Sequence, residues 1–338
     1  MAQQFRALLV GAGGMGQQWA KNLAAHPDVA IAGWVDLRTD AAAQAAHELG
    51  IDVGTTGTDV ERALAALRPD FLVDVTIPEA HHDVTLMALA AGVPVIGEKP
   101  MAATMEQARA MVAASERANT LYMVSQSRRY NAQLQALRRL IVEQTGALGI
   151  LNADFYIGAH FGGFRDQMDS PLILDMAIHT FDAARYLSGA DPVSVYCEEF
   201  NPPWSWYRGA ASATAIFEMT GGLRYTYRGS WCAEGRITSW EGEWRAVGLN
   251  GSATWDGHTA PVAEVVTKTS GFLSEVEPHV ASVAEMPLGI AGSLRDFLHA
   301  LTTGATPMGE CHDNIKSLAM VFAAIESAAT GQRVAISI

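Results

Sequence analysis

Ala7-Leu8-Leu9-Val10-Gly11-Ala12-Gly13-Gly14-Met15-Gly16 is the stretch that decides the fold of this chain. Its first four residues form a continuous apolar run, which is typical of a strand buried on both faces. The glycine-rich turn that follows has the form G-x-G-x-x-G, and the residues after it have the pattern of a helix. In such a turn Gly11 permits the tight bend, Gly13 lets the backbone approach a pyrophosphate, and Gly16 lets helix and strand pack closely. The stretch therefore predicts a dinucleotide-binding turn.

Asp36 ends the next predicted strand, 36 − 16 = 20 residues after the last glycine of the turn. A carboxylate at this place accepts hydrogen bonds from a ribose 2′-hydroxyl. It would repel a 2′-phosphate by about 4 kcal/mol per charge pair, at about 4 Å and an effective dielectric of about 20. We therefore expect NAD to be favoured over NADP. Arg38 opposes this preference if it pairs with a phosphate, and is otherwise an ordinary solvated arginine.

Strand and helix patterns alternate along the first third of the chain, which predicts a doubly wound parallel sheet, a Rossmann domain, over residues 1–124. Residues 125–338 instead carry strand patterns separated by turn signals such as Gly221-Gly222 and Asn250-Gly251, which predicts an α+β domain with a large, mostly antiparallel sheet. We expect this second domain to bind the substrate and to form the oligomer. The predicted strands are residues 7–10, 30–35, 71–75, 93–96, 151–157, 193–200, 213–219, 223–230 and 244–249, and the predicted helices are 17–25, 41–49, 82–91, 294–302 and 313–329.

Composition excludes several classes of partner. Lys+Arg 23 against Asp+Glu 36 gives a net charge of −13, so nucleic acid and anionic membrane surfaces are not expected as partners. The three cysteines are far apart and in no CxxC pair, which argues against a disulfide scaffold or a metal site and suits a reducing compartment. The chain starts without a signal-peptide pattern, and it has no apolar run of about 18 residues. We expect a cytoplasmic protein.

Further motifs follow the glycine turn in order along the chain. Ile77-Pro78-Glu79-Ala80-His81-His82 and Gly97-Glu98-Lys99-Pro100 come after predicted strands, and Asp175-Met176-Ala177-Ile178-His179 follows in the second half. Together with Arg128-Arg129-Tyr130 and the C-terminal Gly331-Gln332-Arg333-Val334, these motifs resemble the glucose–fructose oxidoreductase / inositol dehydrogenase (Gfo/Idh/MocA) family. The resemblance covers nearly the whole chain. It implies an NAD(P)-dependent oxidoreductase that acts on a sugar, polyol or inositol.

The resemblance also implies a set of site residues. Lys99 matches the lysine that contacts the reacting hydroxyl beside the nicotinamide, and Asp175 and His179 match the residues that complete the catalytic site. The Lys99–Pro100 bond is expected to be cis, as X–Pro chemistry permits. Residues expected to bind the cofactor are Gly11, Gly13, Gly14, Met15, Gly16, Asp36, Arg38, Ile77, Pro78, His82 and Glu98.

The same residues suit the chemistry of alcohol oxidation. Removing a hydride from a secondary alcohol requires a base for the hydroxyl proton, and a histidine with a pKa near about 6.5 fits that task. A lysine ammonium stabilises the developing alkoxide. Asp175 and His179 are four residues apart and share a face on a helix, so the carboxylate orients the imidazole or grips a substrate hydroxyl. An exposed ion pair is the alternative that spacing alone leaves open.

Substrate identity is the least determined feature. Ala177 replaces a glycine that the family usually has before the histidine, and Ile77 replaces a threonine before Pro78. Six of the eight tryptophans fall within residues 204–255, where they line a pocket or, alternatively, form a sheet core or subunit interface. The candidates for binding a polar or acidic substrate group are Arg128, Arg129, His160 and Arg165, with surface salt bridging as the alternative.

Other functions remain open on the same fold. They are reduction of a carbonyl or imine, glycoside cleavage with recycled NAD, and cofactor sensing by a regulator without turnover. The retained Lys99, Asp175 and His179 count against a pure sensor, which needs none of them. An antiparallel sheet with one face uncovered invites symmetric pairing, so we expect a homodimer or homotetramer.

Overall fold

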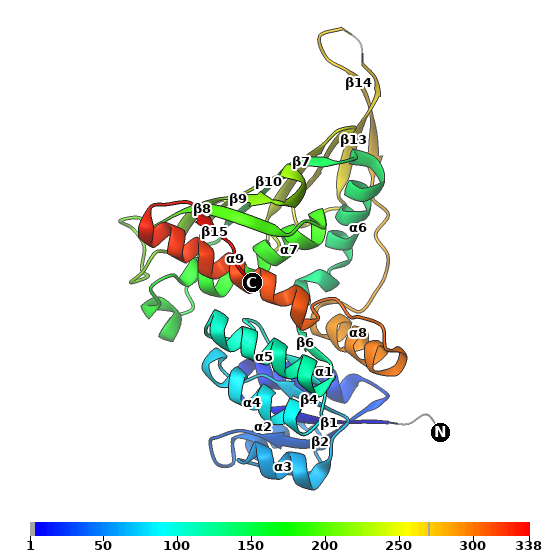
Figure 1. The fold of residues 1–338 in the computed structure, drawn as a ribbon, viewed down its shortest axis with the longest axis vertical. Helices are drawn as coiled ribbons and strands as arrows, with labels where there is room; N and C mark the ends of the chain where they lie inside the picture. Colours follow the sequence, from blue (N-terminus) through cyan, green and yellow to red (C-terminus); the bar gives the residue numbers. More distant parts are fainter. Residues whose placement is uncertain (1–3, 270) are drawn as a thin grey trace. The chain divides into compact units, whose positions relative to one another are not determined.

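A computed structural model describes residues 4–269 and 271–338, and the chain divides into two compact units. The first unit comprises the chain up to Ser127 together with Pro287–Ile315. The second comprises Arg128–Met286 together with Lys316–Ile338. Figure 1 labels the helices and strands of both units.

The first unit is built on a six-stranded parallel sheet in the order β3-β2-β1-β4-β5-β6. This is the Rossmann order, and the direction of winding reverses between β1 and β4, where such sheets bind their ligands. The sheet is buried on both faces, as the apolar run predicts: Ala7, Leu8 and Leu9 have no exposed surface. The strands are β1 (Phe5–Val10), β2 (Val29–Val35), β3 (Thr56–Gly57), β4 (Phe71–Asp74), β5 (Val95–Gly97) and β6 (Tyr122–Val124).

The predicted parallel Rossmann fold is confirmed, and helices connect its strands (Figure 1). The predicted helix over residues 41–49 has the bounds of α2, whereas α3, α5 and the short strands β3 and β6 had no counterpart in the prediction. The helices of this unit are α1 (Gly14–Ala25), α2 (Ala41–Leu49), α3 (Val60–Leu67), α4 (Pro78–Ala90), α5 (Met105–Ala118) and α8 (Gly289–Thr303).

Residues 287–315 belong to the first unit, whereas the predicted boundary after residue 124 placed them with the second half of the chain. An aromatic contact and a backbone hydrogen bond join this segment to the first unit. The ring of Phe297 on α8 meets Phe71 of β4 edge-on, with 5.5 Å between the ring centroids. The backbone of Val124, at the end of β6, donates a hydrogen bond to the carbonyl of Gly309 at 2.8 Å.

The second unit is built on a nine-stranded sheet in the order β14-β13-β12-β11-β7-β10-β9-β8-β15. Its strand pairs are antiparallel except for β7 and β10, which run parallel, so the predicted large and mostly antiparallel sheet is confirmed. The strands are β7 (Leu148–Tyr156), β8 (Pro192–Phe200), β9 (Ser212–Met219), β10 (Arg224–Ser230), β11 (Glu243–Gly248), β12 (Gly251–Trp255), β13 (Val262–Lys268), β14 (Glu275–Val280) and β15 (Val334–Ala335).

Both predicted turn signals lie in hairpins. Gly221 and Gly222, with φ of 73° and 79°, join β9 to β10. In the β11–β12 hairpin Gly248 pairs with Gly251, so the turn is Leu249-Asn250 and not Asn250-Gly251. The sequence thus located this hairpin and missed its centre by one residue.

Helices pack against one face of this sheet. They are α6 (Ala132–Leu140), α7 (Ile178–Ser188) and the part of α9 (Cys311–Thr330) that belongs to this unit. α7 contributes Phe181, whose ring packs edge-on against Phe217 of β9 and Tyr227 of β10, with centroids 4.8 and 5.3 Å apart. A π-helical turn, Leu172–Ala177, leads directly into α7. Among the described helices, we find none that is both long and apolar enough to cross a bilayer.

Candidate active site

The glycine turn after β1 leaves open space for a ligand. A Cβ atom on Gly11, whose φ is +103°, would lie 2.4 Å from the carbonyl oxygen of Val75, and one on Gly16 would lie 2.1 Å from the carbonyl oxygen of Gly11. These two positions therefore require glycine for packing. Beside them, Gly13 and Gly14 face open space, and no side chain caps the N-terminus of α1. The free N–H groups of the helix end can thus bind the diphosphate of a dinucleotide.

The carboxylate of Asp36 is fixed by contacts from both sides. Its Oδ2 atom accepts a hydrogen bond from the backbone of Ala12 at 2.7 Å, which ties the end of β2 to the glycine turn. Arg38 donates to both carboxylate oxygens, from Nε at 2.9 Å and from Nη2 at 3.1 Å. These contacts lower the pKa of Asp36 to about 2, with the Arg38 hydrogen bond as the main cause. Asp36 is therefore ionised at neutral pH, and the guanidinium that partly screens it is itself exposed.

Glu98 anchors the turn that carries Lys99. Its Oε1 atom accepts a hydrogen bond from the indole of Trp19 on α1 at 2.7 Å, and its Oε2 accepts from the backbone of Lys99 at 3.2 Å. Burial raises the pKa of the Glu98 carboxyl, and the Trp19 hydrogen bond opposes that rise. The Lys99–Pro100 bond is cis, as predicted. Glu98, which was predicted to contact the cofactor, is a buried side chain that joins two backbone segments.

The loop after β4 lies at the same edge of the sheet. Asp74 is fully buried, and its Oδ1 atom accepts hydrogen bonds from the Thr76 hydroxyl at 2.6 Å and contacts His81 Nδ1 at 3.0 Å. Burial opposes the charged form of His81, but the carboxylates of Asp74 and Glu98 outweigh it and raise the pKa of His81.

The predicted cofactor residues of this loop differ in exposure. Ile77 is 65% exposed and directly precedes α4, which begins at Pro78. The ring of His82 contacts Asp83 at 2.8 Å. Ile77 is thus the most exposed of the predicted cofactor residues in this loop, while Pro78 and His82 are half-buried.

In the second unit, Asp175 lies in the π-helical turn and His179 in the first turn of α7. π-Helical turns are rare and occur frequently at functional sites. The Asp175 Oδ2 atom accepts a hydrogen bond from Nε of Arg165 at 2.6 Å. One predicted substrate residue is thus brought into direct contact with a predicted catalytic residue.

Arg128 approaches the same turn from another segment. Its Nη1 atom donates to the carbonyl of Trp240, and its Nη2 atom lies 3.6 Å from the thioether sulfur of Met176, the residue after Asp175. Burial lowers the pKa of Arg128. Two of the predicted substrate arginines therefore contact neighbouring residues of one turn.

Aromatic rings surround these arginines. Phe161 lies 6.3 Å from Trp240 and 5.3 Å from Trp231, measured between ring centroids, and Phe161 and Trp240 are each 48% exposed. His160 stacks on Trp206 at 3.7 Å and contacts Glu234 at 2.7 Å. The tryptophan-rich segment was expected either to line a pocket or to form a sheet core or subunit interface. Trp231 is buried and fits the core, whereas Trp240 is exposed to solvent.

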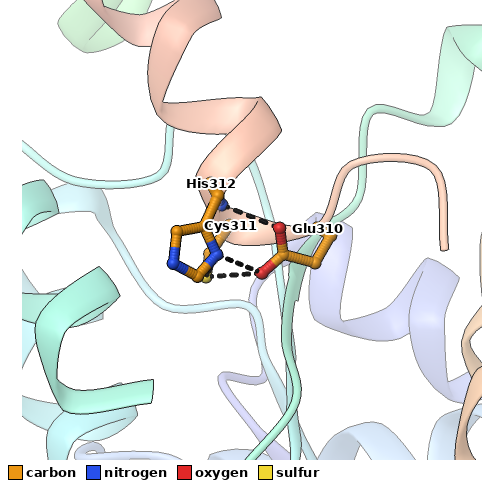
Figure 2. Close-up of side chains that lie close together, drawn as sticks. All are labelled: Glu310, Cys311 and His312. Atoms are coloured by element: carbon orange, nitrogen blue, oxygen red, sulfur yellow. Dashed lines mark hydrogen bonds and ion pairs between the residues drawn. The ribbon is translucent and has the colours of Figure 1, made fainter. Parts of the chain in front are cut away.

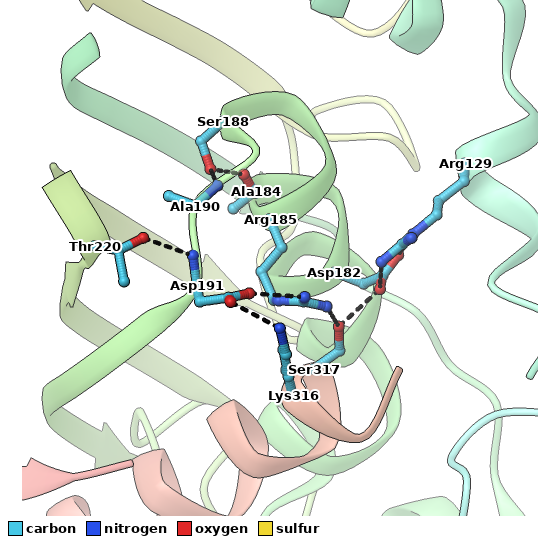
Figure 3. Close-up of polar contacts among 10 residues, drawn as sticks. All are labelled: Arg129, Asp182, Ala184, Arg185, Ser188, Ala190, Asp191, Thr220, Lys316 and Ser317. Carbon is cyan, nitrogen blue, oxygen red and sulfur yellow. Dashed lines mark hydrogen bonds and ion pairs between the residues drawn. The ribbon is translucent and has the colours of Figure 1, made fainter. Parts of the chain in front are cut away.

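Arg129 does not share the environment of Arg128. It is buried and makes two hydrogen bonds to Asp182 on α7, at 2.7 and 2.6 Å. Ser317 of α9 donates to the same Asp182 carboxylate at 2.7 Å and accepts from Arg185 at 3.0 Å (Figure 3). These contacts hold α7, the helix that carries His179, and the predicted contact of Arg129 with substrate stays a prediction.

This buried network was not predicted from the sequence. One available signal is the pair of charges, Asp182 and Arg185, that lies among the mostly buried residues of this helix. Charged residues in such places are buried only when they are paired. Trp19 was missed as well, because nothing in its local sequence indicates a partner 79 residues away.

Glu310, Cys311 and His312 offer ligand atoms within 4.8 Å of one another, and they are residue types that bind metals (Figure 2). In the structure Glu310 Oε1 accepts from the Cys311 thiol at 2.9 Å and contacts His312 Nδ1 at 2.8 Å. The other ring nitrogen of His312 contacts Glu116 of α5 at 2.9 Å. The group thereby joins the end of α5 to the start of α9, and the expectation that the chain has no metal site stays a prediction.

Comparison with known proteins identifies the class. Residues 5–126 match a family model described as an oxidoreductase family with an NAD-binding Rossmann fold, and residues 134–254 match the C-terminal domain of the same family. The two matches together span most of the chain, and the glycine turn fits the dinucleotide that the first one names. The protein is thus an NAD-binding oxidoreductase. It belongs to the Gfo/Idh/MocA family.

Several known proteins are similar over long stretches. The chain is 25% identical over 336 residues to 1,5-anhydro-D-fructose reductase of Ensifer adhaerens, covering 96% of each protein. It is 32% identical over 200 residues to inositol 2-dehydrogenase of an Arthrobacter species, covering 58% of this chain and 57% of the relative. The fold resembles the crystal structure of an oxidoreductase from Agrobacterium radiobacter in complex with NAD+, L-tartaric acid and magnesium, with a TM-score of 0.87, 22% identity and 99% of each chain covered.

Proposed function

We propose that this protein is an NAD-dependent dehydrogenase that transfers a hydride between a hydroxyl-bearing carbon of a sugar, polyol or inositol and the nicotinamide. The observation that carries the proposal lies within the first unit. The glycine turn follows β1 and Lys99 follows β5, so both stand at the carboxyl edge of one parallel sheet. The names of the similar reductase and inositol dehydrogenase support the substrate class.

Each proposed role follows from the chemistry of the side chain. When bound, NAD supplies a nicotinamide ring that accepts or returns the hydride. His179 takes the hydroxyl proton, because an imidazole is a suitable base near neutral pH. The Lys99 ammonium stabilises the negative charge that develops on the oxygen. Asp175, held by Arg165, orients the substrate or the imidazole.

A turnover assay with variants tests these roles. NADH formation is measured with a panel of sugars, polyols and inositols, and the best substrate is then used for His179→Ala and Lys99→Ala. We expect each variant to lose about 100-fold or more in kcat, the usual effect of removing an acid–base or charge-stabilising group. The exposed residues His258 and Lys21 provide matched controls, as His258→Ala and Lys21→Ala. Wild-type turnover in the first two variants would overturn the assignment.

The physiological direction is a separate part of the proposal. A similar protein is named as a reductase, which supports carbonyl reduction as a second candidate on the same site. Comparing NAD with a polyol against NADH with the matching keto compound decides between the directions. Tightly held NAD without net NADH release would instead indicate that the cofactor is recycled, and NAD affinity without any turnover would indicate a regulator.

We also propose a homodimer or homotetramer in the cytoplasm. On β9, Thr214 and Ile216 are exposed while Ala215 and Phe217 are buried, so one face of the sheet carries exposed side chains. Sedimentation that gives a monomer at working concentration would contradict the oligomer. The buried free thiols of Cys197, Cys232 and Cys311 suit a reducing compartment, and cell fractionation tests that location.

A further inference from the structure

Arg165 has hydrogen-bond donors that remain available to a ligand at the candidate substrate site. Its Nε atom is bound to Asp175 at 2.6 Å, and its guanidinium carbon lies over the rings of Phe161 and Phe164, at 5.0 and 4.7 Å from the centroids. Within the described part of the chain, no hydrogen bond is found for its two terminal nitrogens. Its side chain is 33% exposed, so those nitrogens can meet a ligand.

The hydrogen-bond acceptors around Arg128 are weaker than the carboxylate that Arg165 binds. Its Nη1 atom donates to a backbone carbonyl, but the partner of Nη2 is the thioether of Met176, which is a weak acceptor. A half-buried guanidinium usually has a carboxylate or several carbonyls around it, because charge is costly to remove from water. Glu241 contributes charge near Arg128, yet the described residues place no carboxylate in hydrogen-bond contact with it. A strong acceptor is therefore missing from the surroundings of Nη2.

The two arginines are linked through one helical turn. They contact adjacent residues, Asp175 and Met176, of the same π-helical turn. Phe161 lies under the guanidinium of Arg165, and the backbone carbonyl of Trp240 binds Arg128. The rings of Phe161 and Trp240 are 6.3 Å apart. Asp175 pairs with Arg165 and Glu241 adds its charge near Arg128, so a ligand carboxylate would use the remaining hydrogen-bond donors of the two guanidiniums.

We propose that the substrate of this site is a polyhydroxy acid, such as a sugar acid, whose carboxylate binds Arg165 and Arg128 while its C–H face stacks on Trp240 and Phe161. A carboxylate matches the fork of donors on a guanidinium and adds charge-assisted hydrogen bonds. The inference rests on the proposed dehydrogenase function. The carboxylate is unchanged in the reaction: the hydroxyl carbon loses its hydride to NAD+, the hydroxyl proton goes to His179, and a ketone results.

Matched substrate pairs test the proposal. We compare kcat/KM for D-gluconate with that for D-glucitol, and for D-glucuronate with that for D-glucose. We expect the acid to be favoured by about tenfold or more in at least one pair, since a charge-assisted contact contributes about 1.5–3 kcal/mol. Equal or better use of both neutral compounds would overturn the proposal. Preference for the matching sugar phosphates over the acids would also overturn it, because the anion would then be a phosphate ester.

Variants connect the preference to the arginines. Arg128→Met removes the guanidinium without touching Asp175, and Arg165→Met removes both the proposed carboxylate contact and the Asp175 contact. We expect Arg128→Met to reduce the acid-to-neutral ratio by about tenfold. Arg138, an exposed arginine of the same unit, provides the control as Arg138→Met. An unchanged ratio in Arg128→Met and Arg165→Met would contradict the inference.

A binding measurement separates this inference from the proposed function. Calorimetric titration of D-gluconate and D-glucuronate into the wild type and Arg128→Met needs no turnover. Acid binding that is lost in the variant, without turnover of any compound, would support the carboxylate site and contradict the dehydrogenase. Turnover of neutral polyols without acid binding would support the dehydrogenase and contradict the carboxylate site.

Discussion

At the scale of single residues, the surroundings of Asp36 bear most directly on cofactor choice. Its carboxylate is fixed by Ala12 and Arg38 and stays ionised, because its pKa is lowered to about 2. A 2′-phosphate near this charge is repelled, although a guanidinium that turned from Asp36 to the phosphate would offset part of the repulsion. NAD is therefore favoured as long as Arg38 remains paired with Asp36.

Replacing Asp36 should weaken this preference. In Asp36→Ala, Arg38 loses its partner and can bind a phosphate, so we expect the NAD-to-NADP ratio of kcat/KM to fall by about tenfold or more, which corresponds to about 1.4 kcal/mol. Initial rates with both cofactors give the ratio. Asp52→Ala, which removes an exposed acid of the same unit, should leave it unchanged. A constant ratio in Asp36→Ala would show that another group selects the cofactor.

Glu199 gives a pH-dependent prediction. Burial raises the pKa of Glu199 to about 7 from 4.5, although a hydrogen bond from Ser170 at 3.0 Å opposes the rise. The folded state therefore binds a proton that the unfolded state has lost, and stability falls as the pH rises from about 4.5 to about 7. Glu199→Gln lacks that titration. We expect its Tm to exceed that of the wild type by about 2 °C or more above pH ~8 and to match it near pH ~5.

Thermal melts at the two pH values check this expectation. The exposed neighbour Glu198 supplies the control, since Glu198→Gln should shift Tm by a similar small amount at both. A difference between Glu199→Gln and wild type that does not change with pH would contradict the raised pKa.

The proposed catalytic residues could be selected from the sequence because short motifs mark them, as Glu98-Lys99-Pro100 marks Lys99. Partners were not. The contact of Arg165 with Asp175 depends on how the chain turns between them, and the separate fates of Arg128 and Arg129 depend on which side chain points toward α7. Neighbours in sequence have opposite surroundings here, so residue type alone could not distinguish them.

At the scale of elements, α7 is held in place by a buried ion pair. Asp182→Asn removes the charge that Arg129 binds, and both side chains are less than 10% exposed. Because an uncompensated buried charge results, we expect unfolding by urea to show a loss of about 3–5 kcal/mol. We also expect kcat to fall, since α7 carries His179.

An exposed ion pair of the same geometry gives the control. Arg228 makes two hydrogen bonds to Asp154 on the neighbouring strand, with the arginine side chain 57% exposed. Asp154→Asn should therefore cost less than about 1 kcal/mol. Equal losses in Asp182→Asn and Asp154→Asn would refute a special role for burial.

Element types were predicted better than element ends. The period of apolar residues located α2 and the strands β1, β2, β4 and β5 of the first sheet, because a strand buried on both faces has a continuous apolar run. The same period gives no sign of the π-helical turn Leu172–Ala177, which differs from an α-helix by one residue in its hydrogen-bond spacing. β13 and β14 were also missed, since β14 is almost entirely exposed and has no alternation of burial.

At the scale of the whole molecule, sequence motifs in a known order indicated both units and the family. These motifs could not predict that Pro287–Ile315 belongs to the first unit. It depends on contacts such as Phe71 with Phe297, which are separated by more than two hundred residues. Local patterns identify elements, whereas pairings between distant segments appear only in the folded chain.

The protein is proposed to move a hydride from a hydroxyl carbon to NAD. Transfer of deuterium from a substrate deuterated at that carbon tests it most directly, with the NADH product examined by mass spectrometry and NMR. We predict one deuterium on the nicotinamide ring with the wild type, and a rate of labelling reduced by about 100-fold or more in His179→Ala. NADH that forms without deuterium, or substrate that is consumed with no label reaching the cofactor, would contradict the account.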